Sequence, residues 1–204
     1  MRSLLIPIIC SAFLCLVPPL LSDEEKAKRI GLIFEGAFES AELHRKPEGA
    51  QKTILVPFYE WDYGVRAFTK ETWKEQAMSW ERVLPAAEAL ADKVAEQIEP
   101  ELVRDHRDII QYAIVADKDP FLSSVLLSPR FLGRFRDTLG DRLQVVIVDR
   151  HQLFVFPATG GKIAEFGPAL VDAFRQTSLP VSLEVFLVDR NGSRVIGEIT
   201  REEN

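Results

Sequence analysis

The sequence predicts an α+β or mixed α/β fold, in which a mostly antiparallel or mixed sheet of hairpins is packed by several helices on one or both faces. Several apolar runs have strand length and come in pairs separated by turn residues, which is typical of β-hairpins. Segments with a helical apolar period lie between these pairs. Hydrophobic residues make up 47% and charged residues 27% of the 204-residue chain, as in globular proteins. This mixture of hairpins and helices describes an α+β sandwich.

The first 22 residues are set apart by their composition. Arg2 is followed by twenty uncharged, mostly apolar residues, 3–22, and then by the charged run 23–26. One basic residue, an apolar core and the small Ser22 before the cut predict a signal peptide, and hence export to the periplasm or the extracellular space. The alternative is a membrane anchor formed by residues 3–22, because about 20 apolar residues span a bilayer. Three prolines within the run weaken such a helix.

Cleavage after Ser22 would remove both cysteines, Cys10 and Cys15. The mature chain could then form neither a disulfide nor a thiolate metal site. Loss of Arg2 would change the net charge from −6 to −7, with 24 basic against 31 acidic residues. This balance argues against nucleic acid as a partner, and a membrane is expected only if the N-terminal segment is uncleaved. The expected partner is a protein or a small ligand, and no cofactor is predicted.

The rest of the chain divides into an N-terminal helix with a connecting loop, residues 23–52, and a single α+β domain, residues 53–204. The helix is predicted over residues 23–42, because a charged first turn precedes apolar residues at a helical period. These are Ile30, Ile33, Phe34, Ala37, Phe38 and Ala41. The β-rich runs 53–58 and 65–68 then predict a hairpin.

The clearest helical pattern follows residue 69. Its apolar face consists of Trp80, Leu84, Ala87, Leu90, Ala91, Val94 and Ile98. Pro85 interrupts this pattern, so either the helix begins near Leu84 or residues 69–83 form a separate helix that meets it at a kink.

Capping residues place the next two helices. Residues 111–116 are a predicted strand, and Asp119-Pro120 behind them offers an N-cap and a first-turn proline to a helix. Ser128-Pro129 repeats this arrangement, and Gly140 ends the second helix. The inward residues of the second helix are Phe131, Leu132, Phe135 and Leu139.

A further hairpin is predicted from two apolar runs, 143–148 and 153–156, which the turn 149–152 separates. The first run is almost continuously apolar, so both of its faces are expected to be covered in the centre of the sheet.

One helix and one hairpin complete the chain. The helix is predicted from Lys162 to about Gln176. Residues 182–188 and 193–200 follow it and flank Asn191-Gly192, the preferred dipeptide of a type I′ hairpin turn.

Five segments carry a recognisable succession of core and turn residues: 53–58, 87–90, 119–127, 143–153 and 179–186. Together they resemble the bacterial YtpQ-like family, a family of unknown function, over about residues 53–200. The resemblance implies an α+β fold and no established activity. The turn Val148-Asp149-Arg150-His151 departs from the Pro-x-Arg-Asp that is frequent in the family, and the N-terminal leader is a second departure.

Acidic residues provide two candidate sites, although no common catalytic motif occurs in the chain. Asp149 and His151 are candidate catalytic residues, because a carboxylate beside an imidazole can tune a general base. Asp117 and Asp119, with Asp149, end predicted strands and are candidate ligands for a hard cation such as calcium. Turn formation and helix capping account for the same residues without any site.

Basic and aromatic residues provide three more candidates. Gly160, Gly161 and Lys162 precede a helix and are candidate anion ligands, unless they form a plain flexible loop. An arginine cluster suits an acidic partner or an anionic lipid, unless it is only solvated helix surface, and consists of Arg130, Arg134, Arg136 and Arg142. The predicted hairpin tip, residues 61–63, exposes aromatic surface if its rings do not belong to the core.

Two functions from different classes follow. The favoured one is a noncatalytic, exported binding or interaction module, because the missing motifs do not count against it. It requires an exposed patch at the hairpin tip or at the arginine cluster. The alternative is a hydrolase or a metal-assisted enzyme that uses Asp149, His151 and the Asp117/Asp119 pair, and it requires these four side chains to share one concave pocket.

Overall fold

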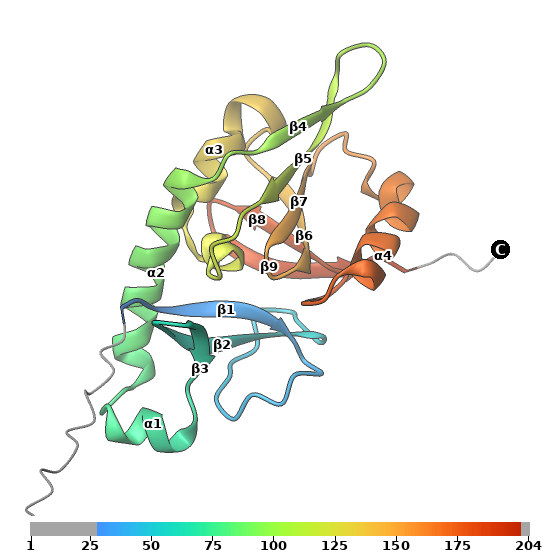
Figure 1. The fold of residues 1–204 in the computed structure, drawn as a ribbon. Helices are drawn as coiled ribbons and strands as arrows, with labels where there is room; N and C mark the ends of the chain where they lie inside the picture. The colour runs from blue at the N-terminus through green and yellow to red at the C-terminus, as the bar shows by residue number, and fades with distance from the viewer. Residues whose placement is uncertain (1–27, 201–204) are drawn as a thin grey trace, which may run out of the picture.

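The computed structural model of the protein describes residues 28–200 (Figure 1). The predicted signal peptide or membrane anchor, and its cleavage after Ser22, lie outside these residues. Among the helices of residues 28–200, none is long and apolar enough to cross a membrane.

Two antiparallel sheets confirm the predicted α+β class. The smaller sheet contains, in spatial order, β1 (Ile30–Gly36), β2 (Thr53–Trp61) and β3 (Gly64–Ala67). The larger sheet contains, in spatial order, β4 (Glu101–Arg104), β5 (Ile110–Ala116), β7 (Gln152–Pro157), β6 (Leu143–Asp149), β8 (Glu184–Asp189) and β9 (Gly192–Glu198). The predicted central hairpin is thus β6–β7, whereas β4 was not predicted.

The predicted helix over residues 23–42 is wrong in the part that the structure describes, because residues 30–36 form strand β1. This strand pairs with β2 along its whole length, and six of its seven residues are buried. A strand covered on both faces has no polar side, so its sequence lacks the alternation that identifies half-buried strands. The packing on β1 is close, because a Cβ on Gly31 would lie 2.7 Å from side-chain atoms of Leu90 and Phe121.

The region after residue 69 forms two helices, α1 (Lys70–Glu75) and α2 (Trp80–Gln97). The separate short helix is therefore confirmed, but α2 begins at Trp80 and continues through the exposed Pro85. The buried face of α2 packs on β1 and on the segment after Asp119, and α2 runs beside both sheets in Figure 1.

The two helices after β5 begin near the predicted capping residues. The first is a 3₁₀ helix, η1 (Leu122–Leu127), and the second is α3 (Pro129–Leu139). The Ser128 hydroxyl accepts the Arg130 N–H at 3.1 Å, and Gly140 ends α3 with a φ of 94°. Both ends of α3 are therefore confirmed.

The C-terminal helix is divided into η2 (Ile163–Phe166) and α4 (Gly167–Gln176). The β8–β9 hairpin is confirmed, but its turn is not type I′. That turn needs a positive φ at both central residues, and within the turn 189–192 only Gly192 has one, at 106°. The Asp189 carboxylate instead accepts the Asn191 N–H at 2.8 Å, which closes an Asx turn.

The two sheets share one hydrophobic core. Phe34 of β1 meets Phe186 of β8 edge to face, with ring centroids 5.5 Å apart. Buried residues of α2, η1 and α3 join the same cluster. The opposite face of the larger sheet carries a second cluster, which α4 covers. Surfaces next to α3 and next to α4 therefore lie on opposite sides of the larger sheet.

Candidate functional site

The predicted Asp149–His151 pair lies at the β6–β7 turn. Asp149 accepts the His151 N–H at 2.6 Å and also accepts the hydroxyl of Thr177. The His151 ring turns to another partner, because its Nδ1 lies 3.1 Å from the carbonyl oxygen of Asp117. The two side chains thus stabilise the turn and its neighbours, and the structure places no hydrogen bond between carboxylate and imidazole.

A shallow cavity of about 460 Å³ does contain Asp149 and His151 together with Gln176 and Thr177. Asp117 and Asp119 are not among the residues that line it. The structure therefore brings together two of the four side chains that the enzyme hypothesis requires.

The two other aspartates have local partners. Asp117 accepts the Asp119 N–H at 2.7 Å, and Asp119 accepts the Phe121 N–H at 2.8 Å. The second oxygen of Asp119 forms an ion pair with Arg29 at 2.7 Å. Among residues 28–200, no group of three His, Cys, Asp or Glu side chains is placed to hold a metal ion.

The predicted anion-binding loop is open and internally paired. Lys162 Nζ forms an ion pair with Glu165 at 3.0 Å, and both side chains are exposed. Gly160 has a φ of 72°, and a Cβ on Gly161 would clash with the carbonyl oxygen of Pro157. The helix that follows is the four-residue η2, so the loop does not lead into a long helix dipole.

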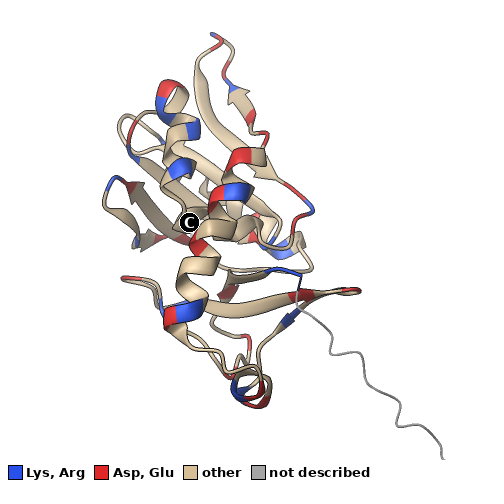
Figure 2. Cartoon of the chain, turned by 90° about the vertical axis from the view of Figure 1, so that its left-hand side faces the viewer, with Lys and Arg blue, Asp and Glu red and all other residues tan. Residues whose placement is uncertain are grey.

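The predicted arginine cluster separates into two pairs. Arg130 pairs with Asp92 at 3.4 Å and with Glu96, and Arg134 donates to the carbonyl of Ile98 at 2.8 Å. Figure 2 shows both signs of charge along α2 and an excess of basic bands on α3. The first pair therefore ties α3 to α2 and does not face a ligand.

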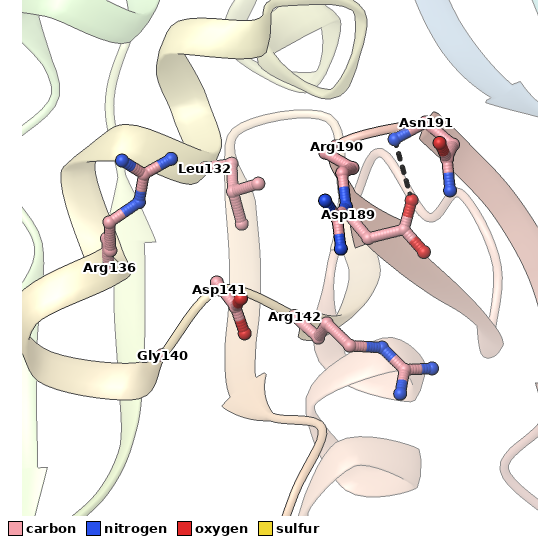
Figure 3. A pocket seen from close by; sticks show the side chains of 8 residues that line it. All are labelled: Leu132, Arg136, Gly140, Asp141, Arg142, Asp189, Arg190 and Asn191. Atoms are coloured by element: carbon pink, nitrogen blue, oxygen red, sulfur yellow. Dashed lines mark hydrogen bonds between the residues drawn. The ribbon is translucent and has the colours of Figure 1, made fainter.

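The second pair, Arg136 and Arg142, lines a cleft of about 760 Å³ with a third arginine, Arg190 (Figure 3). We call this the arginine cleft. Its remaining lining residues are Leu132, Gly140, Asp141, Asp189 and Asn191. The walls come from the end of α3, from the loop before β6 and from the β8–β9 turn.

The charges in the arginine cleft are not paired evenly. Asp189 accepts from Arg194 at 3.1 Å and from the Asn191 N–H, and these interactions lower the pKa of its carboxyl. No ion pair within residues 28–200 engages any of the three cleft arginines, which are all exposed. The cleft thus presents three arginines without an ion-pair partner in this part of the chain beside two carboxylates, of which Asp189 is already occupied.

Sequence reasoning missed Arg190 and Asn191. They lie about fifty positions after Arg136 and Arg142, and they belong to a turn whose Asx geometry explains its composition without any function. The pairing of β6 with β8 brings the two segments together, from Leu143 opposite Val188 onward.

The hairpin tip between β2 and β3 is exposed. Tyr63 has 84% of its surface accessible and packs edge to face on Trp61, with centroids 4.8 Å apart. Arg66 stacks on the ring of Trp61, with its guanidinium carbon 3.4 Å from the ring centroid. Trp73 and Trp80, in contrast, pack against the core.

Comparison of the chain with family models, with curated proteins and with solved structures finds no match. The resemblance to the YtpQ-like family stays a prediction that rests on the five segments quoted for it.

Proposed function

We propose that the protein is a noncatalytic binding module, exported from the cell, that holds an anionic ligand in the arginine cleft. The observation that supports this proposal is that Arg136, Arg142 and Arg190 line one cleft without an ion-pair partner within residues 28–200. A guanidinium group presents several N–H donors in a fixed plane, which suits the two oxygens of a carboxylate or a phosphate. The open cleft predicts modest affinity, because solvent screens exposed charges.

An anion titration tests this proposal. Inorganic phosphate and acetate are added to the ¹⁵N-labelled chain, and amide shifts are followed by NMR. We expect saturable shifts around residues 136–142 and 189–192 that weaken as salt is raised. Arg142→Gln should weaken binding about two- to fivefold, as for a single exposed ion pair. Replacing all three cleft arginines by Gln should abolish it.

Arg175→Gln is the matched control. Arg175 is an exposed arginine in the last turn of α4, on the opposite side of the larger sheet. The Arg175→Gln variant should show the same amide shifts as the wild type. Equal shifts in the triple variant and in the wild type would refute the arginine cleft as the binding site.

A second candidate function is hydrolysis with His151 as the general base. One contact favours it: when Nδ1 donates its proton to the Asp117 carbonyl, Nε2 remains free to accept one. The ring also lines the 460 Å³ cavity, where a water molecule and a small ester have room.

Turnover of p-nitrophenyl acetate and p-nitrophenyl phosphate tests this candidate. A general base contributes about a hundredfold or more, so His151→Gln should reduce the rate by that factor. His106→Gln, at an exposed histidine in the β4–β5 turn, should not change it. No rate above that of buffer, or an equal rate in both variants, would exclude the hydrolase.

A further inference from the structure

A second hollow adjoins the arginine cleft between the start of α3 and the end of β8. It has a volume of about 290 Å³, and its apolar wall consists of Leu126, Leu127, Pro129, Leu132 and Val188. We call it the leucine groove. Four residues line both hollows: Leu132, Arg136, Asp189 and Arg190. The charged cleft and the apolar groove therefore share a wall.

The polar groups at the leucine groove already have partners. Ser128 donates its hydroxyl to Asp92 at 2.5 Å and accepts the Arg130 N–H. Asp189 is occupied by Arg194 and Asn191. The inner wall of the leucine groove thus offers apolar contact. Arg136 and Arg190, at the junction with the arginine cleft, are its polar groups without an ion-pair partner in the described residues.

We propose that the two hollows form one site for an amphiphilic monoanion, an acyl chain of about eight carbons that ends in a carboxylate. This inference rests on the proposed anion-binding function and names its ligand class. The carboxylate lies between Arg136 and Arg190, and the chain lies along Leu127, Leu132 and Val188.

Charge and size select this ligand. The arginine cleft carries three arginines, and of its two aspartates Asp189 already pairs with Arg194, so an anionic head group meets an excess of positive charge. A groove of about 290 Å³ holds on the order of ten methylene-sized groups, if each takes about the 30 Å³ of one liquid water. Octanoate meets both conditions.

Calorimetric titration with octanoate, butyrate and octanol tests the proposal. Each fully buried methylene raises affinity about fourfold, so four additional methylenes give at most about 250-fold. We expect octanoate to bind at least tenfold more tightly than butyrate, because the groove is open on one side. Octanol has the chain without the charge and should bind at least tenfold more weakly than octanoate.

Two variants separate the head group from the chain. Leu127→Ser removes a half-buried wall of the groove and should weaken octanoate binding while butyrate binding stays the same. Arg190→Gln should weaken both, and Arg175→Gln should weaken neither. An amide NMR spectrum of each variant verifies the fold, and Pro129→Gln, at an exposed position of the same wall, replaces Leu127→Ser if that chain unfolds.

The outcomes distinguish this inference from the proposed function. If acetate and phosphate bind in the arginine cleft but octanoate binds no more tightly than butyrate, the amphiphile is excluded and anion binding stands. If octanoate binds equally well to Arg190→Gln, its carboxylate does not lie at the junction and the proposal is wrong. If no anion binds at all, both proposals fail.

Discussion

A buried ion pair between Glu35 and Arg150 joins the two sheets. Arg150 Nη2 lies 2.6 Å from Glu35 Oε1, and the two side chains are 19% and 5% exposed, respectively. The contact lacks hydrogen-bond geometry, since Glu35 Oε1 and Arg150 Nε have no hydrogen-bond partner in the described part of the chain. Burial raises the pKa of Glu35 to about 7, although the charge of Arg150 opposes this shift. A buried carboxylate that is incompletely satisfied is expected to disfavour its charged form.

The raised pKa of Glu35 predicts that the protein loses stability as pH rises. Between the unfolded pKa near 4.5 and the folded pKa near 7, the native state holds a proton that the unfolded state has released. The free energy of unfolding therefore falls by about 3 kcal/mol from pH 4.5 to above pH 7. Urea unfolding at pH 4.5, 6, 7 and 8 measures this free energy. The Glu35→Gln variant should lack the part of its pH dependence that comes from Glu35.

Arg150→Gln provides the control for this titration. Loss of the positive charge raises the folded pKa of Glu35 further, so the fall in stability should still begin near pH 4.5 but extend to higher pH. Parallel pH profiles for the wild type and Glu35→Gln would contradict the prediction, because every other titrating group is present in both chains.

Secondary elements were predictable where one face is polar or where a cap marks an end. The caps Ser128 and Gly140 gave boundaries of α3 that the structure confirms, whereas the periodicity of α2 located this helix but not its start at Trp80. Strand β1 was not predictable, because its two covered faces hide the alternation and its apolar spacing also fits a helix. Glu35 is a charged residue buried in this strand, and its partner Arg150 lies far away in the sequence.

In the candidate site, too, local contacts were predictable and contacts made by distant segments were not. Local contacts explain Asp117, Asp119 and Asp149, and their turn chemistry is visible in the sequence. The arginine cleft depends on the β6–β8 pairing, which joins segments far apart in the chain. Arg136 and Arg142 were predicted as part of a local arginine cluster, and Arg190 was not singled out, because strand order cannot be read from local patterns.

At the scale of the whole molecule, ion pairs reinforce the joint core. Arg29 binds Glu60 of β2 at 2.6 Å and Asp119 before η1 at 2.7 Å, while its guanidinium lies 5.1 Å from the ring centroid of Phe121. Together with Glu35–Arg150, this contact fixes the smaller sheet to the larger one. The arginine cleft is formed by α3, the loop before β6 and the β8–β9 turn, and these contacts do not involve its lining residues.

The order of the chain predicts that removal of the leader leaves this architecture intact. The core residues within the described part begin at Leu32, and Lys28 is held by an ion pair with Asp62 at 2.8 Å. Cleavage after Ser22 would leave the new N-terminus five residues before Lys28. We expect cell fractionation to place the protein in the soluble exported fraction, and N-terminal sequencing to begin at Asp23. A chain that retains Met1 and sediments with membranes would instead identify residues 3–22 as an anchor.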